Sequence, residues 1–129
     1  MLLNKGLAQY QQVDTACALE NASPHRLIQM LMEKILQRLA EAKGAIQRQE
    51  KLQKGEAIGR AVAIVDGLRS SLNVDVGGEM AANLDELYLY IERRLLEANL
   101  HSNENVIDEV ILLMSTVKSG WDSIEKVAV

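Results

Sequence analysis

Apolar residues recur along most of the chain at alternating steps of three and four, the spacing of one face of an α-helix. The first such stripe follows Ser23 and Pro24, and it predicts a helix over residues 24 to about 49. Ser23 is placed to cap this helix, because a serine side chain accepts backbone N–H groups and proline fits the first helical position. The stripe consists of Ile28, Met32, Ile35, Leu39, Ala42 and Ile46.

Three further stretches have the same spacing. The second predicts a helix over residues 55 to about 72, after which the glycine-containing stretch 73–78 breaks the pattern. The third predicts a helix that ends near Asn99, and the fourth predicts a helix after the polar link 101–103. Their stripes are, in turn, Ile58, Ala61, Val65, Leu68 and Leu72; Met80, Leu84, Leu87, Ile91, Leu95 and Ala98; and Ile107, Val110, Met114, Val117, Trp121 and Ile124. No stretch shows sustained alternation of period two, so the predicted fold class is all-α.

Four helices joined by short polar links favour an antiparallel four-helix bundle, because short links leave successive helices side by side and reversed. We assign residues 23–129 to this bundle domain. Residues 1–22 carry apolar side chains at loosely helical spacing. They predict a short helical N-terminal arm that is too small to fold by itself.

The cellular compartment follows from what the chain contains. It has 129 residues and one cysteine, Cys17. A domain of this size buries enough surface to fold without disulfides or metals, and a lone cysteine fits a reducing compartment. The opening residues lack the apolar stretch of a secretory signal, and no apolar run approaches the ~20 residues that span a bilayer. These features predict a cytoplasmic protein without membrane insertion.

Charge is distributed unevenly along the chain. Residues 1–72 carry ten Lys or Arg and seven Asp or Glu, whereas residues 73–129 carry four and eleven. The acidic overall balance, with a pI near 5.2, argues against a nucleic-acid partner. We interpret the charges as solvated faces in which basic helices pair with acidic ones.

The sequence contains no recognisable catalytic or metal-binding constellation. Di-iron bundles place Glu-x-x-His on two helices, and this chain has no such motif; its two histidines are His25 and His101. Gly77-Gly78 is not followed by the Lys-Ser/Thr of a phosphate-binding loop. The sequence therefore predicts no enzyme activity, no cofactor and no metal ligand.

The predicted second helix has an edge of small residues. Gly59, Ala63 and Gly67 recur at steps of four, although each interior glycine destabilises a helix by about 0.5–1 kcal/mol relative to alanine. Either a neighbouring helix of the bundle packs closely there, or the edge forms a shallow groove for an amphipathic helix of a partner. The sequence leaves both interpretations open.

Apolar residues exceed what one bundle seam needs. The predicted fourth helix has a second apolar row, and the first helix also has additional leucines. Wide apolar faces are common in globular bundles, but the surplus also suits a protein that binds amphipathic peptides. An exposed apolar groove needs a cover when no partner is bound, and the arm at residues 1–22 is a candidate for that cover.

These residues resemble the FliS family of flagellar secretion chaperones. Three segments carry the resemblance: residues 21–31, with Ala22-Ser23-Pro24; residues 83–99, with Leu87-Tyr88-Leu89-Tyr90, Arg94-Leu95 and Glu97-Ala98-Asn99; and residues 108–121, which end in Gly120-Trp121. Asn21 departs from the threonine that is more usual in the family. The resemblance extends from about Tyr10 to Trp121, in the same order and with the same spacing of helices.

The resemblance implies a small antiparallel helical bundle that acts as a non-catalytic chaperone. It implies that the chain binds the disordered C-terminal segment of flagellin in the cytoplasm, prevents premature polymerisation and delivers flagellin to the flagellar type III export apparatus. Leu7 and Tyr10 match the family's aliphatic-x-x-Tyr arm, which is implicated in contact with a component of the export gate. These roles are expectations for this chain.

The candidate partner-binding residues combine both lines of reasoning. Tyr88 and Tyr90 point to different sides of one helix, so at most one lies in the core and the other suits an interface. The full set is Leu7, Tyr10, Gly59, Ala63, Gly67, Tyr88 and Tyr90.

Two alternatives come from other classes of protein. A structural bundle that self-associates through its surplus apolar rows predicts a homodimer in the absence of cargo. A bundle enzyme or metalloprotein is the other, and the missing Glu-x-x-His pair argues against it.

Overall fold

A computed structural model of the chain describes residues 22–72 and 74–124. In these ranges it contains four α-helices, which are α3 (Pro24–Gln47), α4 (Lys51–Ser71), α5 (Val74–His101) and α6 (Glu104–Ser123). The described residues include no β-strand. The predicted all-α fold class is therefore confirmed, and none of the described helices is long and apolar enough to cross a membrane.

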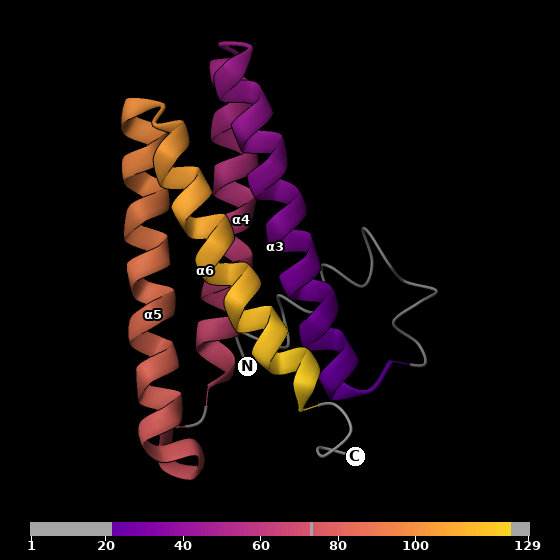
Figure 1. Ribbon diagram of the computed structural model, residues 1–129. Helices are drawn as coiled ribbons and strands as arrows, with labels where there is room; N and C mark the ends of the chain where they lie inside the picture. The colour runs from indigo at the N-terminus through magenta and orange to yellow at the C-terminus, as the bar shows by residue number, and fades with distance from the viewer. Residues whose placement is uncertain (1–21, 73, 125–129) are drawn as a thin grey trace.

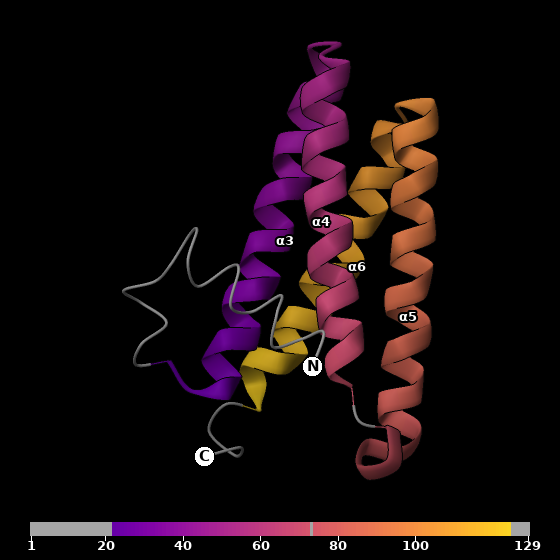
Figure 2. The ribbon, with the colours of Figure 1, turned by 180° about the vertical axis from the view of Figure 1, so that it is seen from behind.

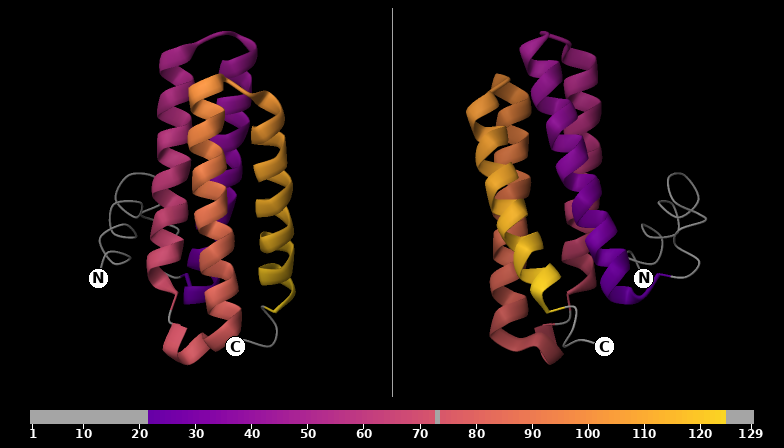
Figure 3. Two further views of the ribbon diagram at one scale, coloured as in Figure 1. Left: turned by 90° about the vertical axis from the view of Figure 1, so that its left-hand side faces the viewer. Right: turned by 45° about the vertical axis from the view of Figure 1, so that its right-hand side comes forward.

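The helices form an antiparallel bundle in which each helix packs against two neighbours (Figure 1). α3 packs against α4 and α6, and α5 packs against the same two helices from the other side. The view from behind shows α4 between α3 and α5 (Figure 2). We call the end with the α3–α4 and α5–α6 turns the closed end, and the end where α3 and α5 begin the open end (Figure 3).

The core follows the predicted stripes. The largest fully buried side chains come from all four helices: Met32, Ile35, Leu39, Ile58, Ile64, Val65, Leu68, Ile91, Leu95, Ile107, Val110 and Met114. Met80 was expected in the third stripe, but its side chain is 75% exposed, and Ala81 is buried instead. The reason is tertiary, because α6 leaves α5 toward the open end and no longer covers that stretch (Figure 1).

The start of α3 is as predicted. Pro24 is at the start of the helix, and the Ser23 side chain accepts a hydrogen bond of 3.1 Å from the backbone N–H of Arg26. The helix ends at Gln47, two residues before the expected end. Gln49 then has φ +59°, and the Glu50 N–H donates to the Ala45 carbonyl at 2.9 Å. This left-handed turn satisfies carbonyls at the end of α3.

Two boundaries differ from the sequence prediction. α4 begins at Lys51, four residues earlier than expected, because the turn at Gln49 reverses the chain at once and leaves no longer loop. The expected break at residues 73–78 is shorter than predicted: α5 begins at Val74 and is kinked at Gly78, which has φ +59° and ψ −134°. Glycine adopts this conformation without the steric strain that a Cβ would cause.

The division into an arm and a bundle is described only in part. Residues 1–21 lie outside the described residues, and so do residues 125–129. The predicted arm, together with Leu7, Tyr10 and Cys17, therefore remains a prediction. Residues 23–72 and 74–124 contain the bundle.

Candidate partner-binding surface

The small-residue edge of α4, formed by Gly59, Ala63 and Gly67, faces away from the bundle. Gly59 and Ala63 are exposed and Gly67 is half-buried. A Cβ added at Gly59 or Gly67 would meet no neighbouring atom within 4 Å. Among the described residues no helix packs closely on this edge, and its role as a groove for a partner stays a prediction.

Exposed leucines flank the small-residue edge. Lys54 contacts the carbonyl of Asn99 at 2.8 Å, and Arg69 bonds to Asp85 at 2.8 Å, so α4 and α5 run antiparallel with a fixed register. In that register Gly59 lies near the level of Leu96, whose side chain is 60% exposed. We call these residues, together with other exposed leucines of the two helices, the α4–α5 outer face: Leu52, Gly59, Ala63, Gly67, Leu96 and Leu100.

Acidic side chains lie along the same pair of helices. Arg69 donates to the Asp85 carboxylate and lies 3.9 Å from that of Asp66. Partial burial raises the pKa of the Glu92 carboxyl, and the negative charge of Asp66 raises this pKa further. Arg69 thus lies among three carboxyl groups, and its positive charge partly offsets the effect of Asp66 on the pKa of Glu92.

A second apolar feature is an open hollow at the start of α5, which we call the α5 hollow. It has a volume of about 480 Å³ and is lined by Glu79, Met80, Asn83, Leu84 and Leu87. The exposed Met80 and the half-buried leucines give it an apolar wall, and Glu79 and Asn83 give it a polar rim. Its size fits one or two large side chains of a bound peptide.

The two tyrosines of α5 separate as expected, because they point to different sides of the helix. Tyr88 is in the core at 3% exposure, and burial raises the pKa of its hydroxyl to about 12. Tyr90 is 40% exposed, and its hydroxyl donates to the Glu109 carboxylate of α6 at 2.5 Å. Of the two, only the Tyr90 ring is therefore exposed at the surface, while its hydroxyl is engaged within the bundle.

Charged pairs connect the basic half of the chain to the acidic half, as the charge distribution predicted. Lys43 of α3 bonds to Asp108 of α6 at 2.8 Å, which raises the pKa of the lysine. At the other end of α6, hydrogen bonds from Lys118 and Gln29 lower the pKa of Asp122. These pairs are partly exposed, so solvent screens them and they contribute little to the stability of the bundle.

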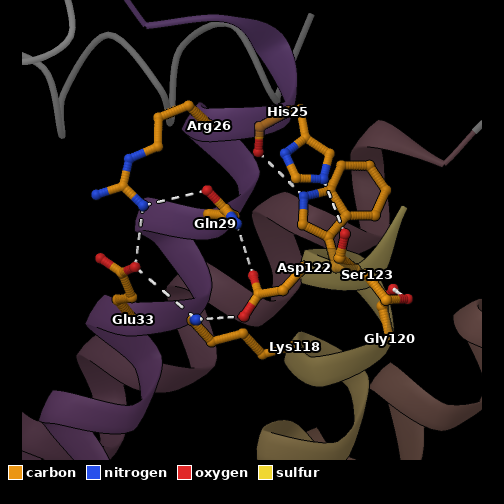
Figure 4. Close-up of polar contacts among 9 residues, drawn as sticks. His25, Arg26, Gln29, Glu33, Lys118, Gly120, Asp122 and Ser123 are labelled. Atoms are coloured by element: carbon orange, nitrogen blue, oxygen red, sulfur yellow. Dashed lines mark hydrogen bonds and ion pairs between the residues drawn. The ribbon is translucent and has the colours of Figure 1, made fainter. Parts of the chain in front are cut away.

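The sequence reasoning missed an aromatic contact between α3 and α6 (Figure 4). The His25 and Trp121 rings stack with centroids 4.7 Å apart and an interplanar angle of 7°. His25 Nε2 lies 2.8 Å from the Trp121 carbonyl oxygen and must carry the proton, because a carbonyl only accepts. Trp121 Nε1 donates in return to the His25 carbonyl at 3.0 Å.

A polar pair extends this contact by one turn. Gln29 Nε2 donates to Asp122 Oδ1 at 2.6 Å, and the Gln29 side chain is buried. We call His25, Gln29, Trp121 and Asp122 the α3–α6 clasp. Its aromatic partners are separated by 96 positions in the sequence, and no local pattern pairs them, although both lie in segments that carried the family resemblance.

The described residues contain no group of three or more His, Cys, Asp or Glu side chains that could hold a metal ion. The described surface features are an edge of small residues on α4, exposed leucines and an apolar hollow on α5. Such a surface suits an amphipathic segment of a partner.

Comparison with known proteins decides the family. The family model described as flagellar protein FliS matches residues 6–128 of this chain. The chain belongs to the FliS family. The predicted family resemblance is thereby confirmed over nearly the whole length.

Individual relatives in this family are flagellar secretion chaperones. The chain is 48% identical to flagellar secretion chaperone FliSB of Pseudomonas aeruginosa over 124 residues, which is 96% of this chain and 98% of the relative. It is 40% identical to flagellar secretion chaperone FliS of Salmonella typhimurium over 125 residues, 96% of this chain and 93% of the relative. A match to FliS of Bacillus subtilis is 26% identical over 121 residues, 94% of this chain and 86% of the relative. The chain thus spans nearly the full length of FliS proteins.

Proposed function

We propose that this chain is a flagellin-specific export chaperone. It binds the disordered C-terminal segment of flagellin in the cytoplasm, prevents premature polymerisation and delivers its cargo to the flagellar type III export apparatus. Membership of the FliS family supports this role. The single observation that carries the binding mode is the small-residue edge of α4, which is not packed against any of the other described helices.

The α4–α5 outer face is the surface that we assign to a helical piece of the cargo. A helix approaches another closely where the side chains are small, and Gly59 and Ala63 allow such an approach along α4. Leu96 and Leu100 of α5 then bury apolar area against the same helix. Apolar burial contributes about 25 cal/mol per Å², so an apolar side chain of the cargo gains most beside these leucines.

The α5 hollow gives a second point of contact. The cargo is a long disordered segment, and a long segment is able to reach two separate sites on one small bundle. When cargo is absent, the N-terminal arm at residues 1–22 covers part of the apolar surface. Leu7 and Tyr10 of this arm contact a component of the export gate.

A binder of this kind has to release its cargo as well as hold it. Folding of a disordered segment on binding consumes ~2–5 kcal/mol or more of the gross interaction free energy. The net affinity is therefore lower than the buried area suggests, which suits a chaperone that passes flagellin on. No catalytic step is needed for such a cycle.

Isothermal titration tests the proposal. The purified protein is titrated with a synthetic peptide of about forty residues from the C-terminus of flagellin of the same source. We expect saturable 1:1 binding with a negative heat-capacity change, because apolar surface is buried and the peptide folds. Absence of binding by a well-folded protein would contradict the proposed cargo.

A variant and a matched control locate the surface. Ala63→Arg fills the small-residue edge and is expected to abolish binding of the peptide while melting stays nearly unchanged, because Ala63 is exposed. Ala40→Arg places the same side chain on the exposed face of α3 and should bind like the wild type. Equal binding by both variants would remove the small-residue edge from the interface, and unfolding of Ala63→Arg alone would show a structural role.

The exposed leucines also favour a second candidate, a homodimer of the cargo-free protein. Leu96, Leu100 and Leu112 are all exposed at the surface of α5 and α6. Sedimentation velocity over a range of concentrations tests this dimer. A dimer that dissociates to a 1:1 complex on addition of the flagellin peptide fits both proposals, whereas a dimer that excludes the peptide favours the structural role.

A further inference from the structure

α6 has two neighbours, and its bonds to them change along its length. Near the closed end it is joined to both: Lys43 of α3 bonds to Asp108 at 2.8 Å, and Arg94 of α5 bonds to Glu109 at 2.8 Å. Tyr90 of α5 adds a hydrogen bond to the same glutamate at 2.5 Å. This half of α6 is therefore held between α3 and α5.

Toward the open end the described bonds of α6 to another helix go to α3. They are the two reciprocal His25–Trp121 hydrogen bonds, the Gln29–Asp122 bond at 2.6 Å and the Lys118–Glu33 ion pair at 3.9 Å. Figure 4 shows Gln29 and Glu33 of α3 reaching Asp122 and Lys118 of α6. The ribbon accordingly crosses from beside α5 at the closed end to beside α3 at the open end (Figure 1).

We propose that the α3–α6 clasp is a positioning device that holds the last turns of α6 against α3 and thereby keeps the α5 hollow open for cargo. His25 and Trp121 are positioning residues in this proposal and do not contact the cargo themselves. The α5 hollow lies on the stretch of α5 from which α6 has turned away.

A restraint is needed because the hydrophobic effect favours closure. Met80 is exposed in the α5 hollow, and Leu84 and Leu87 are half-buried there. Ile124 at the end of α6 is also exposed. Movement of the end of α6 toward α5 would bury these side chains against each other, which is favourable in water.

The geometry of the clasp is suited to oppose that movement. The two ring N–H groups each bond to the other residue's backbone carbonyl, so the contact fixes both the distance and the orientation of the helix ends. The bonds near Glu109 would then act as the pivot if the clasp opened.

The link to cargo rests on the proposed function. If only a fraction of molecules has the hollow open, the apparent affinity for a peptide that uses it falls by that same fraction. A variant in which the open form falls to about one tenth would bind about tenfold more weakly. The position of α6 is measured in the absence of cargo. A finding that the flagellin peptide does not bind would therefore leave the proposed role of the clasp in positioning α6 open to its own test.

A distance measurement in the cargo-free protein is the direct test. Spin labels are attached to Glu86→Cys on α5, outside the α5 hollow, and Gly120→Cys on α6, in a chain whose Cys17 is changed to Ala. Both labelled positions are exposed, and a side chain at Gly120 meets no neighbouring atom within 4 Å. We expect His25→Leu to shorten the distance between the labels by several ångströms.

Two glutamines of α3 provide a matched pair of variants. Gln29 and Gln47 each donate a 2.6 Å hydrogen bond to an acidic residue of α6, Gln29 at the open end and Gln47 at the closed end. Gln29→Leu is expected to shorten the label distance, and Gln47→Leu is expected to leave it unchanged. If His25→Leu melts too early to be labelled, Gln29→Leu carries the test.

The outcomes separate positioning from general stability. An unchanged or longer distance in both His25→Leu and Gln29→Leu would overturn the proposal, and so would an equal shortening in Gln47→Leu. Titration with the flagellin peptide is the second readout, with Gln29→Leu expected to bind about tenfold more weakly than Gln47→Leu. If the label distance shortens in Gln29→Leu alone but both variants bind the peptide equally well, the clasp positions α6 without affecting cargo binding. That result would overturn the proposed link to cargo.

Discussion

At the closed end of the bundle a buried lysine and two tight turns hold the helices together, whereas at the open end α6 leaves α5 and an apolar hollow stays uncovered. At the closed end Lys54 of α4 donates to the Asn99 carbonyl at 2.8 Å and to Ser102 Oγ at 2.7 Å. At the open end the α3–α6 clasp holds one side only. The same chain thus combines a rigid anchor with a surface left available for a partner.

The two ends differ in how their side chains are buried. Fully buried side chains lie between all four helices along most of the bundle, from Ile107 near the closed end to Leu68 near the open end. At the α5 hollow Glu79 and Met80 are exposed, whereas Leu84 and Leu87 are half-buried and pack against the edge of this core. In the proposed function, a partner that binds at this end would contact side chains that are only partly involved in holding the bundle together.

The largest contrast is expected from truncation of one apolar side chain on α5 in each region. Leu95 is fully buried, so Leu95→Ala should lower the free energy of unfolding by about 2–5 kcal/mol. Met80→Ala in the α5 hollow should change it by less than about 0.5 kcal/mol. Urea denaturation followed by circular dichroism measures both. Equal losses would mean that the open end is packed as tightly as the core.

Alkaline titration locates the boundary between the two regions along α5. Burial raises the pKa of the Tyr88 hydroxyl from 10.0 to about 12. Between these values the folded protein keeps a proton that the unfolded chain loses, so stability is complete below pH 10 and falls as the pH rises. We expect the wild type to lose about 2 kcal/mol between pH 9 and pH 11.5 from this group.

Tyr88→Phe removes the titrating group and is the control for that loss. The wild type and the variant should differ in their pH slope above pH 10 and agree below it. Urea denaturation at each pH gives the comparison. Parallel pH profiles would show that water reaches the Tyr88 hydroxyl, and the open region would then extend further along α5.

The anchor at the closed end is expected to have a smaller effect. Lys54→Met removes the charged donor to the Asn99 carbonyl at the end of α5, and we expect a loss of about 1.5 kcal/mol. Lys51→Met changes an exposed lysine in the first turn of the same helix and should stay within about 0.5 kcal/mol of the wild type. Thermal unfolding of the three proteins provides the measurement. If Lys54→Met unfolds at the same temperature as the wild type, the Asn99 carbonyl has found another hydrogen-bond donor.

Local features made part of the fold predictable from sequence. Ser23 and Pro24 start α3 as expected because a cap depends only on adjacent residues. The stripe that ends in Leu95 and Ala98 is buried as expected, because one face of a helix keeps its neighbours over many turns. Met80 lies on the same stripe but is exposed. Its burial depends on the path of α6, which no local pattern in the sequence reveals.

The candidate surface was predictable to a similar extent. Glycine and alanine at steps of four indicated a close approach at the small-residue edge, but only the structure excluded packing within the bundle. The stack of His25 on Trp121 was not predictable, since it depends on how two helix ends meet after the whole chain has folded. Leu7 and Tyr10 stay predictions.

The smallest changes in stability are expected from glycine substitutions in the two turns of the closed end. They show whether the two turns are strained to the same extent. Gln49 and Ser102 both have positive φ, at 59° and 49°, a conformation that strains a residue with a Cβ. Gln49→Gly should therefore stabilise the protein by about 0.5–1 kcal/mol. Ser102→Gly relieves the same strain but removes the hydroxyl that accepts from Lys54 at 2.7 Å, so its net gain should be smaller. Thermal unfolding compares the two variants with the wild type. A larger gain for Ser102→Gly than for Gln49→Gly would show that the lysine gains nothing from Ser102 and anchors the closed end through the Asn99 carbonyl alone.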